Sequence, residues 1–343
     1  LLIGNWRDLP VSFGPEMDMR AMGLLASLWR YAQEENTSPA VASPFDFLPP
    51  NHKETDLPHL VAVQSESFVD PRGLYSGIRP EVLKEFDRLK ADAMAHGKLK
   101  VPAWGANTVR TEFAFLSGIG EEKLDVHRFN PYRAIASGWE VPSLASYLKH
   151  LGYRTVCIHP YPASFYQRDR VYPRMGFDEF LDIREFDDSM RFGPYIGDIA
   201  VADKVAAHLQ KATGPLFVFV ITMENHGPLH MEKATPSDID TLYSVPPPEG
   251  CDDLTIYLRH LRNADRMIAQ LRQTLEHCGQ PASLCWFGDH VPIMPAVYER
   301  FGTPSGEVEY VLFDNQKSND PQKLELHAHG LALGWMRAAG VVR

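Results

Sequence analysis

Short apolar runs alternate with longer amphipathic segments along most of this 343-residue chain. Strands that are apolar almost throughout, such as "PLFVFVITM" at 215–223, are typical of a parallel sheet covered by helices on both faces. The sequence therefore predicts an α/β fold with a mainly parallel central sheet and helices on both of its faces. The expected strands are 57–66, 153–160, 215–224, 282–290 and 309–313, and the expected helices are 80–97, 108–117, 143–152, 198–212, 252–277 and 326–339.

The beginning of the chain differs from this alternating pattern. Residues 19–35 have apolar side chains at helical spacing, and a Pro-rich segment follows them. We therefore expect a lead-in helical segment and linker at 1–55 and one main domain at 56–343. The chain starts at Leu1 and shows no signal peptide, which fits either a cut just after a membrane helix or a fragment boundary.

Charge and cysteine spacing exclude several classes of protein. A net charge of −10 does not suit a nucleic-acid-binding protein, which needs a basic face. The four cysteines have no CxxC spacing, so neither a zinc ribbon nor a thioredoxin-like motif is expected. Disulfide pairing stays open in an oxidising compartment, but free thiols are favoured because lone cysteines are commonly buried.

Carboxylates and imidazoles follow several of the expected strands. Glu66, His159, His226 and the pair Asp289–His290 each stand at the carboxyl end of an apolar run. One such Asp-His pair is equally compatible with a simple surface turn. Four strand ends with this chemistry point instead to a ligand site, because ligands of open α/β sheets bind beyond the carboxyl ends of the strands.

The residue types at this edge suit a divalent cation. Glu66, Asp289 and His290 would supply mixed oxygen and nitrogen ligands for Mn²⁺ or Zn²⁺ and leave a coordination position open. Thr108 stands at the expected start of a helix, where backbone N–H groups favour an oxyanion or phosphate. A cation beside its hydroxyl would lower the pKa of that hydroxyl and make Thr108 a nucleophile. Its alternative role is a plain helix N-cap.

Five motifs of the chain resemble those of a known family. They occur in the same order in lipoteichoic acid synthase-like phosphoglycerol transferases, which belong to the alkaline phosphatase and sulfatase superfamily. The resemblance covers about residues 58–340 and implies that 56–343 is a sulfatase-like catalytic domain. The motifs are "VAVQSESF", "GANTVRTEF", "HPYPASFYQRDRVYPRMGFDEF", "ITMENHGPL" and "WFGDH".

The resemblance also implies roles for individual residues. Glu66, Asp289 and His290 match the metal ligands of the family, in which the metal is usually manganese; Mg²⁺ and Zn²⁺ are alternatives. Thr108 matches the threonine that accepts the phosphoglycerol group and also contacts the metal. His226 matches a histidine near the transferred phosphate, and we expect it to be catalytic.

Three further residues are expected to bind substrate. Arg168 matches an arginine that grips glycerol phosphate, and we expect it on a loop over the site; its alternative role is a surface ion pair with Asp169 or Asp178. Tyr166 stands where lipoteichoic acid synthases have tryptophan and is expected to pack against the glycerol carbons. His159 ends a strand at the same edge and is expected to line the pocket.

The expected function follows from this resemblance. The chain would move glycerol phosphate from a phosphatidylglycerol-type lipid to a glycan acceptor, through a phospho-threonine intermediate. A phosphoethanolamine transferase or a phosphodiesterase or phosphatase of the same superfamily is the alternative, and a non-catalytic sensor or glycan-binding domain is a third. The family implies the extracytoplasmic, periplasmic face of the bacterial cell envelope, with a membrane anchor provided by segments absent from this chain.

Overall fold

The computed structural model describes residues 10–49, 57–316 and 320–342. Within them, nine strands form one sheet, and β5 (Arg191–Phe192) and β6 (Tyr195–Ile196) form a separate hairpin. The strands of the large sheet are β1 (His59–Ser65), β2 (Ala95–Lys100), β3 (Arg154–Ile158), β4 (Glu179–Leu181), β7 (Leu216–Ile221), β8 (Ala282–Gly288), β9 (Val308–Asp314), β10 (Gln322–Lys323) and β11 (Leu326–His327).

The sheet is mixed but mostly parallel. Its strand order is β10-β2-β9-β8-β1-β7-β3-β4, and β11 also pairs with β2. The five strands from β8 to β4 run parallel, whereas β9 is antiparallel to β8 and to β2. The prediction of a mainly parallel α/β sheet is therefore confirmed.

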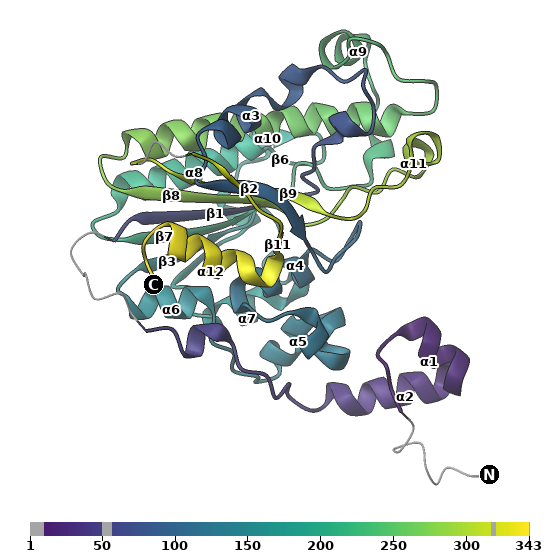
Figure 1. Cartoon of the computed structure of the whole chain (residues 1–343), viewed down its shortest axis with the longest axis vertical. Coiled ribbons are helices and arrows are strands. Elements are labelled where there is room, and N and C mark those ends of the chain that lie inside the picture. The colour runs from purple at the N-terminus through teal and green to yellow at the C-terminus, as the bar shows by residue number, and fades with distance from the viewer. Residues whose placement is uncertain (1–9, 50–56, 317–319, 343) are drawn as a thin grey trace.

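Helices cover both faces of this sheet. Figure 1 shows α10, α8 and α3 on one face and α12, α6 and α4 on the other. The helices are α1 (Pro15–Met22), α2 (Leu24–Glu35), α3 (Lys84–Ala91), α4 (Thr108–Ser117), α5 (Pro131–Ala136), α6 (Leu144–His150), α7 (Arg168–Arg174), α8 (Asp198–Lys211), α9 (Pro236–Leu242), α10 (Asp252–His277), α11 (Pro295–Phe301) and α12 (Ala328–Ala338).

The continuous apolar strands divide their side chains between two cores. In β1, Leu60 and Ala62 pack into the core on the α4 and α12 face, whereas Val61 and Val63 pack into the core on the α10 face. All seven residues of β1 are buried. A strand in the middle of a three-layer fold has no solvent-exposed face. Its sequence therefore does not alternate between polar and apolar residues.

Two predicted helices are wrong in part. The expected helix 80–97 ends at Ala91, and Ala95 begins β2, which pairs antiparallel with β9. Pairing with β9 overrides the helix propensity of this Ala- and Lys-containing segment. The expected helix 19–35 is divided into α1 and α2 at Gly23, whose φ of 82° is outside the helical region.

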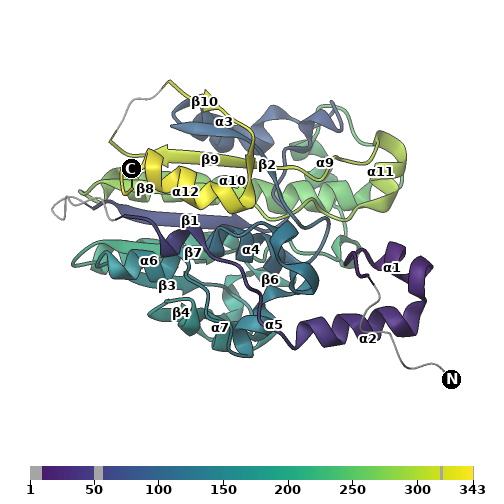
Figure 2. The same cartoon turned by 60° about the horizontal axis from the view of Figure 1, so that its bottom comes forward.

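The lead-in contacts the main body at several points. Tyr31 stacks against Phe129, with ring centroids 6.0 Å apart, and Ser43 Oγ donates to the carbonyl oxygen of Ser117 at 2.8 Å. Figure 2 shows α2 beside α5 and α1 next to α2 farther from α5, at one end of the molecule. The predicted boundary at 55–56 lies outside the described residues.

The structure also describes the cysteines and the lengths of the apolar helices. All four cysteines are free thiols, which confirms the favoured prediction. Over the ranges that the structure describes, no helix has both the length and the apolar character of a membrane span.

The end of α4 depends on a glycine. Gly118 caps the helix with φ 67° and ψ 14°, and its N–H donates to Ala114 O at 3.0 Å. A Cβ at this position would lie 2.5 Å from Pro44 Cγ. The position therefore requires a left-handed backbone and offers no space for a side chain.

We predict that Gly118→Ala lowers the free energy of unfolding by about 1–3 kcal/mol, because it combines backbone strain with a clash. Gly334→Ala is the matched control, since it lies inside α12 with no atom within 4 Å of the new methyl group. It should raise stability by about 0.5–1 kcal/mol. Urea denaturation measures both, and equal stability of Gly118→Ala and wild type would contradict this account of the helix end.

Candidate active site

A cavity of about 480 Å³ lies at the carboxyl edge of the parallel strands. Its walls come from the segments that follow β1, β3, β7 and β8, together with the start of α4 and the turn before α7. The structure brings together around it all the site residues expected from the sequence: Glu66, Thr108, His159, Tyr166, Arg168, His226 and His290 line the cavity, and Asp289 adjoins Glu66 and His290.

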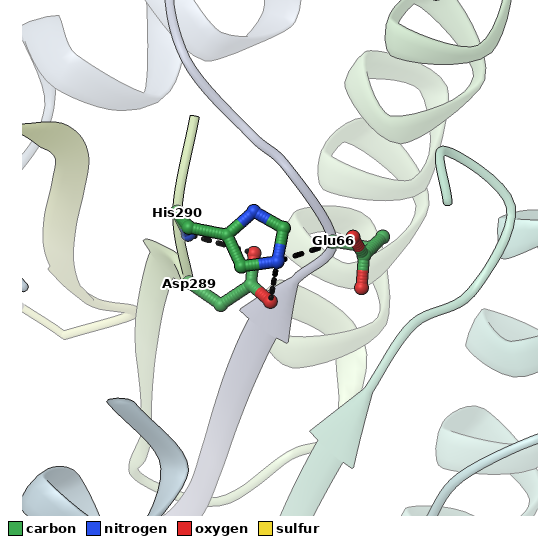
Figure 3. A group of neighbouring side chains, drawn as sticks. All are labelled: Glu66, Asp289 and His290. Atoms are coloured by element: carbon green, nitrogen blue, oxygen red, sulfur yellow. Dashed lines mark hydrogen bonds and ion pairs between the residues drawn. The ribbon is translucent and has the colours of Figure 1, made fainter. Parts of the chain in front are cut away.

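Glu66, Asp289 and His290 form a buried group with the geometry of a metal site. One ligand atom of each lies within 4.8 Å of the others. In Figure 3 the His290 ring points toward both carboxylates; its Nε2 lies 3.2 Å from Asp289 Oδ2 and 3.7 Å from Glu66 Oε1. Each of the three residues is at most 3% exposed. Their charged groups therefore have little access to water.

The electrostatics of this group favour an added cation. Burial, and then the neighbouring Asp289 carboxylate, raise the pKa of Glu66. Burial opposes a charged His290, but the Asp289 and Glu66 carboxylates outweigh it and raise the pKa of that imidazole. Two buried carboxylates this close destabilise each other unless positive charge lies between them.

Hydrogen bonds orient the ligand atoms of this cluster. Asp289 Oδ1 accepts from the backbone N–H groups of Ser67 and His290, each at 2.8 Å. Asp289 Oδ2 is buried and forms no hydrogen bond within the described part of the chain. His290 Nδ1 lies 3.1 Å from the carbonyl oxygen of Val291, which fixes its N–H there and makes Nε2 the atom that could bind a cation. This donor set fits a divalent cation.

Thr108 is the first residue of α4 and faces this cavity. The N-cap position belongs to Asn107, whose backbone is left-handed with φ 67°, so the alternative role of Thr108 as N-cap is wrong. The hydroxyl of Thr111, one turn later, donates to the carbonyl oxygen of Asp289 at 2.7 Å. That bond ties the first turn of α4 directly to the segment that carries two of the proposed metal ligands.

Arg168 lies elsewhere than the sequence predicted. It is the first residue of α7, it is 1% exposed, and it pairs with neither Asp169 nor Asp178 within the described residues. Its Nε and Nη2 donate to the two oxygens of Glu112, at 3.1 and 2.7 Å. Most of the guanidinium fork is therefore used inside the protein: Nη1 also lies 3.2 Å from His159 Nε2, so one N–H of Nη1 and one of Nη2 remain for a ligand.

The Arg168 guanidinium also determines the state of His159. Arg168 Nη1 lies 3.2 Å from His159 Nε2, and a guanidinium can only donate, so that nitrogen must accept. The other ring nitrogen, Nδ1, then donates to Ile221 O at 3.1 Å. Burial, followed by the charge of Arg168, lowers the pKa of His159 well below its usual value. His159 is thus a neutral imidazole with one defined tautomer.

Strained backbone surrounds the cavity. Ser67, Asn107 and Tyr166 line it with φ of 52°, 67° and 54°, values that side-chain-bearing residues rarely adopt. Tyr166 is followed by Gln167 with φ 57°, and the Tyr166 ring lies 5.2 Å from the Arg168 guanidinium carbon. Such conformations concentrate at functional sites, where the surrounding structure maintains them.

His226 is oriented from the hairpin β5–β6. Its Nδ1 lies 2.6 Å from Gly227 O, and Tyr195 Oη lies 3.1 Å from the same oxygen and 3.2 Å from Nδ1. The carbonyl oxygen can only accept, so Nδ1 carries the proton and donates to it. The other ring nitrogen, Nε2, is left to exchange a proton with a ligand.

Sequence reasoning missed Glu112, Thr111 and Tyr195. Glu112 had a detectable signal: it is four residues after Thr108, so both lie on one face of α4. A carboxylate buried in that position needs a cation. Tyr195 had no comparable signal, because only the tertiary structure brings its hairpin to His226.

The chain resembles known proteins over most of its length. Residues 58–340 match the family model described as Sulfatase. The capsular polysaccharide biosynthesis protein RkpI of Rhizobium meliloti (strain 1021) is 32% identical over 256 residues, which cover 74% of this chain and 44% of that protein. The chain thus spans less than half the length of this relative.

Two solved structures share the fold. The phosphoglycerol transferase GacH of Streptococcus pyogenes, in complex with sn-glycerol-1-phosphate, has a TM-score of 0.68 at 18% identity and covers 96% of this chain and 82% of its own. The lipoteichoic acid synthase LtaP of Listeria monocytogenes matches with a TM-score of 0.67 at 19% identity. The match covers 87% of this chain and 76% of the LtaP chain. The predicted resemblance to the alkaline phosphatase and sulfatase superfamily is confirmed.

We predict that Asp289→Asn abolishes retention of a divalent cation but preserves the fold. The amide oxygen can still accept from Ser67 and His290, whereas an amide nitrogen replaces the ligand atom Oδ2. Manganese should raise the melting temperature of wild type and leave that of the variant unchanged, as thermal unfolding and elemental analysis would show. A variant that keeps stoichiometric metal would refute the ligand assignment.

We predict that Glu112→Gln lowers the free energy of unfolding by about 3–5 kcal/mol, because Arg168 is left as a buried charge without a counter-ion. The matched control is Glu179→Gln, which removes the carboxylate that pairs with Arg154 at 2.5 Å on the surface, where the side chains are 37% and 59% exposed. That change should cost less than about 1 kcal/mol. Similar losses in urea denaturation of the two variants would contradict the special role of the buried pair.

Proposed function

Because the chain belongs to the sulfatase family, we propose that it is a metal-dependent phosphotransferase that moves glycerol phosphate from a phosphatidylglycerol-type lipid to a glycan. One observation carries this proposal: Thr108 lines the same cavity as Glu66 and His290, which form a buried cluster with Asp289. The resemblance to a phosphoglycerol transferase and to a protein of capsular polysaccharide biosynthesis supports the choice of transferred group and acceptor.

In the first half of the proposed reaction, the Thr108 oxygen attacks the phosphorus of the donor. The bond between phosphorus and the diacylglycerol oxygen breaks, and diacylglycerol leaves with a proton. Thr108 loses its hydroxyl proton and carries glycerol phosphate as a phosphodiester. A cation held by Glu66, Asp289 and His290 would lower the pKa of the attacking hydroxyl and neutralise charge on the phosphate.

In the second half, a hydroxyl of the acceptor glycan attacks the same phosphorus. The bond to the Thr108 oxygen breaks, the acceptor loses its proton, and Thr108 regains one. We assign these proton exchanges to Nε2 of His226, since Nδ1 is held by the Gly227 carbonyl. The helix N-terminus at Thr108 and the Nη1 edge of Arg168 would bind the phosphate oxygens.

The proposed setting is the extracytoplasmic face of a bacterial envelope. A lipid donor is found in a membrane, and a periplasmic or cell-surface glycan is found outside the cytoplasm. We therefore propose that this catalytic domain acts at the membrane surface and that segments beyond this chain anchor it. The manganese ion is proposed as the cofactor, because His290 among two carboxylates favours a transition metal over calcium.

We predict that incubation with phosphatidylglycerol and manganese adds one glycerol phosphate group to Thr108, detectable by mass spectrometry of the protein and its peptides. Thr108→Ala should give no adduct. Thr111→Ser is the control, since it keeps the hydroxyl that donates to Asp289 and should keep the adduct. An adduct on Thr108→Ala would refute the assigned nucleophile.

The same experiment distinguishes the alternatives. An adduct formed only from phosphatidylethanolamine would make the chain a phosphoethanolamine transferase. Release of free phosphate from monoesters without a diester adduct would make it a phosphatase. The absence of any adduct or turnover with every donor, in protein that binds manganese, would favour a sensor or glycan-binding domain.

A further inference from the structure

A second cluster of charged side chains lies behind the wall of the cavity. At its centre is His260 of α10, which is 1% exposed. Its Nδ1 lies 3.1 Å from Glu224 Oε1, and its Nε2 lies 2.7 Å from Glu232 Oε1. One imidazole therefore joins two carboxylates that are separated by eight positions in the sequence.

Both ring nitrogens of His260 are donors. The carboxylates of Glu224 and Glu232 are acceptors only, so a ring that bonds to both is an imidazolium. Burial opposes this charge, but the hydrogen bond and charge of Glu224, together with Glu232, outweigh it and raise the pKa of His260. The positive charge is thus matched by two adjacent negative charges in a buried setting.

Other bonds fix the same two carboxylates. Glu224 also accepts from Asn263 Nδ2 at 2.6 Å and from the backbone N–H of Asp198 at 2.7 Å. Glu232 accepts from Arg259 Nη2 at 2.6 Å. His260, Asn263 and Arg259 all belong to α10. Both ends of segment 224–232 are therefore attached to one long, packed helix.

The middle of segment 224–232 forms part of the cavity wall. Residues 225–230 line the cavity, and His226 is among them. The edge of the Phe192 ring meets the His260 ring, with centroids 5.4 Å apart. Phe192 belongs to the hairpin β5–β6, whose Tyr195 contacts Gly227 and His226. The bonds of His260 to Glu224 and Glu232 and the proposed catalytic imidazole of His226 are thus connected through segment 224–232 and the hairpin β5–β6.

We propose that His260 is a positioning residue of the active site: its imidazolium attaches both ends of segment 224–232 to α10 and so holds His226 at the cavity. His260 itself lies behind the cavity wall and is absent from the cavity lining. The inference rests on the proposed function for its kinetic consequences, but the attachment of the segment can be measured without turnover.

The proposal has a pH consequence with a definite sign. A histidine with a raised pKa in the folded protein contributes stability that is complete at low pH and is lost as the pH rises through that raised value. Above it, one of the two carboxylates loses its bond from His260 and keeps only its other donors, so segment 224–232 is held less firmly. The charged or titratable groups facing this cluster are Glu224, Glu232, Asp198, Arg259 and Asp238.

The test is His260→Gln, compared with wild type and with His277→Gln. Glutamine carries no charge, and it offers one donor nitrogen where the imidazolium has two. His277 is the matched control because it is an exposed histidine on the same helix, bonded to the carbonyl oxygen of Gln273. Cleavage of bis(4-nitrophenyl) phosphate in manganese is measured against pH, with the melting temperature of each protein.

We predict that His260→Gln lowers kcat about 10- to 100-fold with a smaller change in KM, because His226 is displaced from its working position. The alkaline decline of activity due to His260 should disappear from its pH profile. His277→Gln should behave like wild type in both respects. A folded His260→Gln protein with wild-type kcat and pH profile would overturn the proposal.

Two further measurements keep the outcome clear. Hydrogen exchange of the backbone amides in 224–232 should become faster in His260→Gln and not in His277→Gln, even if the substrate is not turned over. Unchanged exchange would also overturn the proposal.

If His260→Gln fails to fold, Glu232→Gln replaces it, since that side chain is 19% exposed and the change weakens only one of the two bonds of His260. It should lower kcat and shift the alkaline decline to lower pH.

Discussion

The mutual repulsion of two buried carboxylates is the constraint around which this structure is organised. Glu66 and Asp289 end adjacent parallel strands, β1 and β8, and both are almost fully buried. Like charges in a poorly solvated site are stable only with positive charge between them. His290 supplies part of it, and Asp289 Oδ2, which accepts no hydrogen bond from the described residues, indicates where a cation would complete it. The surrounding hydrogen bonds serve to hold these three side chains in that arrangement.

Helix α4 connects the proposed metal site to the side of the cavity that is proposed to bind phosphate. Thr108 stands at its start, Thr111 bonds to the carbonyl of Asp289, and Glu112 fixes the guanidinium of Arg168. A shift of this helix would move the proposed nucleophile, the segment with two proposed metal ligands and the arginine together. Such coupling explains why this helix contains buried Thr and Glu residues among apolar residues that face the core.

Three histidines in or near the cavity are each held by a different polar or charged partner. Arg168 fixes the tautomer of His159, the Gly227 carbonyl fixes that of His226, and His260 joins the two ends of the segment that carries His226. The two buried imidazoles His159 and His260 therefore have opposite charge states. His159 is neutral because it faces a guanidinium, whereas His260 is charged because it faces two carboxylates.

Local sequence patterns predicted the fold class and the four strand ends that meet at the cavity, whereas Thr108, Tyr166 and Arg168 were assigned to it through the family resemblance. Continuous apolar strands required a covered parallel sheet, and polar residues at four strand ends had to meet at one edge. The positions of Arg168 and of β2 were decided only by tertiary contacts: Arg168 is buried by a carboxylate 56 positions away, and Ala95–Lys100 becomes a strand by pairing with β9. A local sequence pattern shows which side chains of a segment are apolar and so which will be buried. The partners of an ion pair or of a strand depend on which distant segments the fold brings together, and a local pattern does not contain that information.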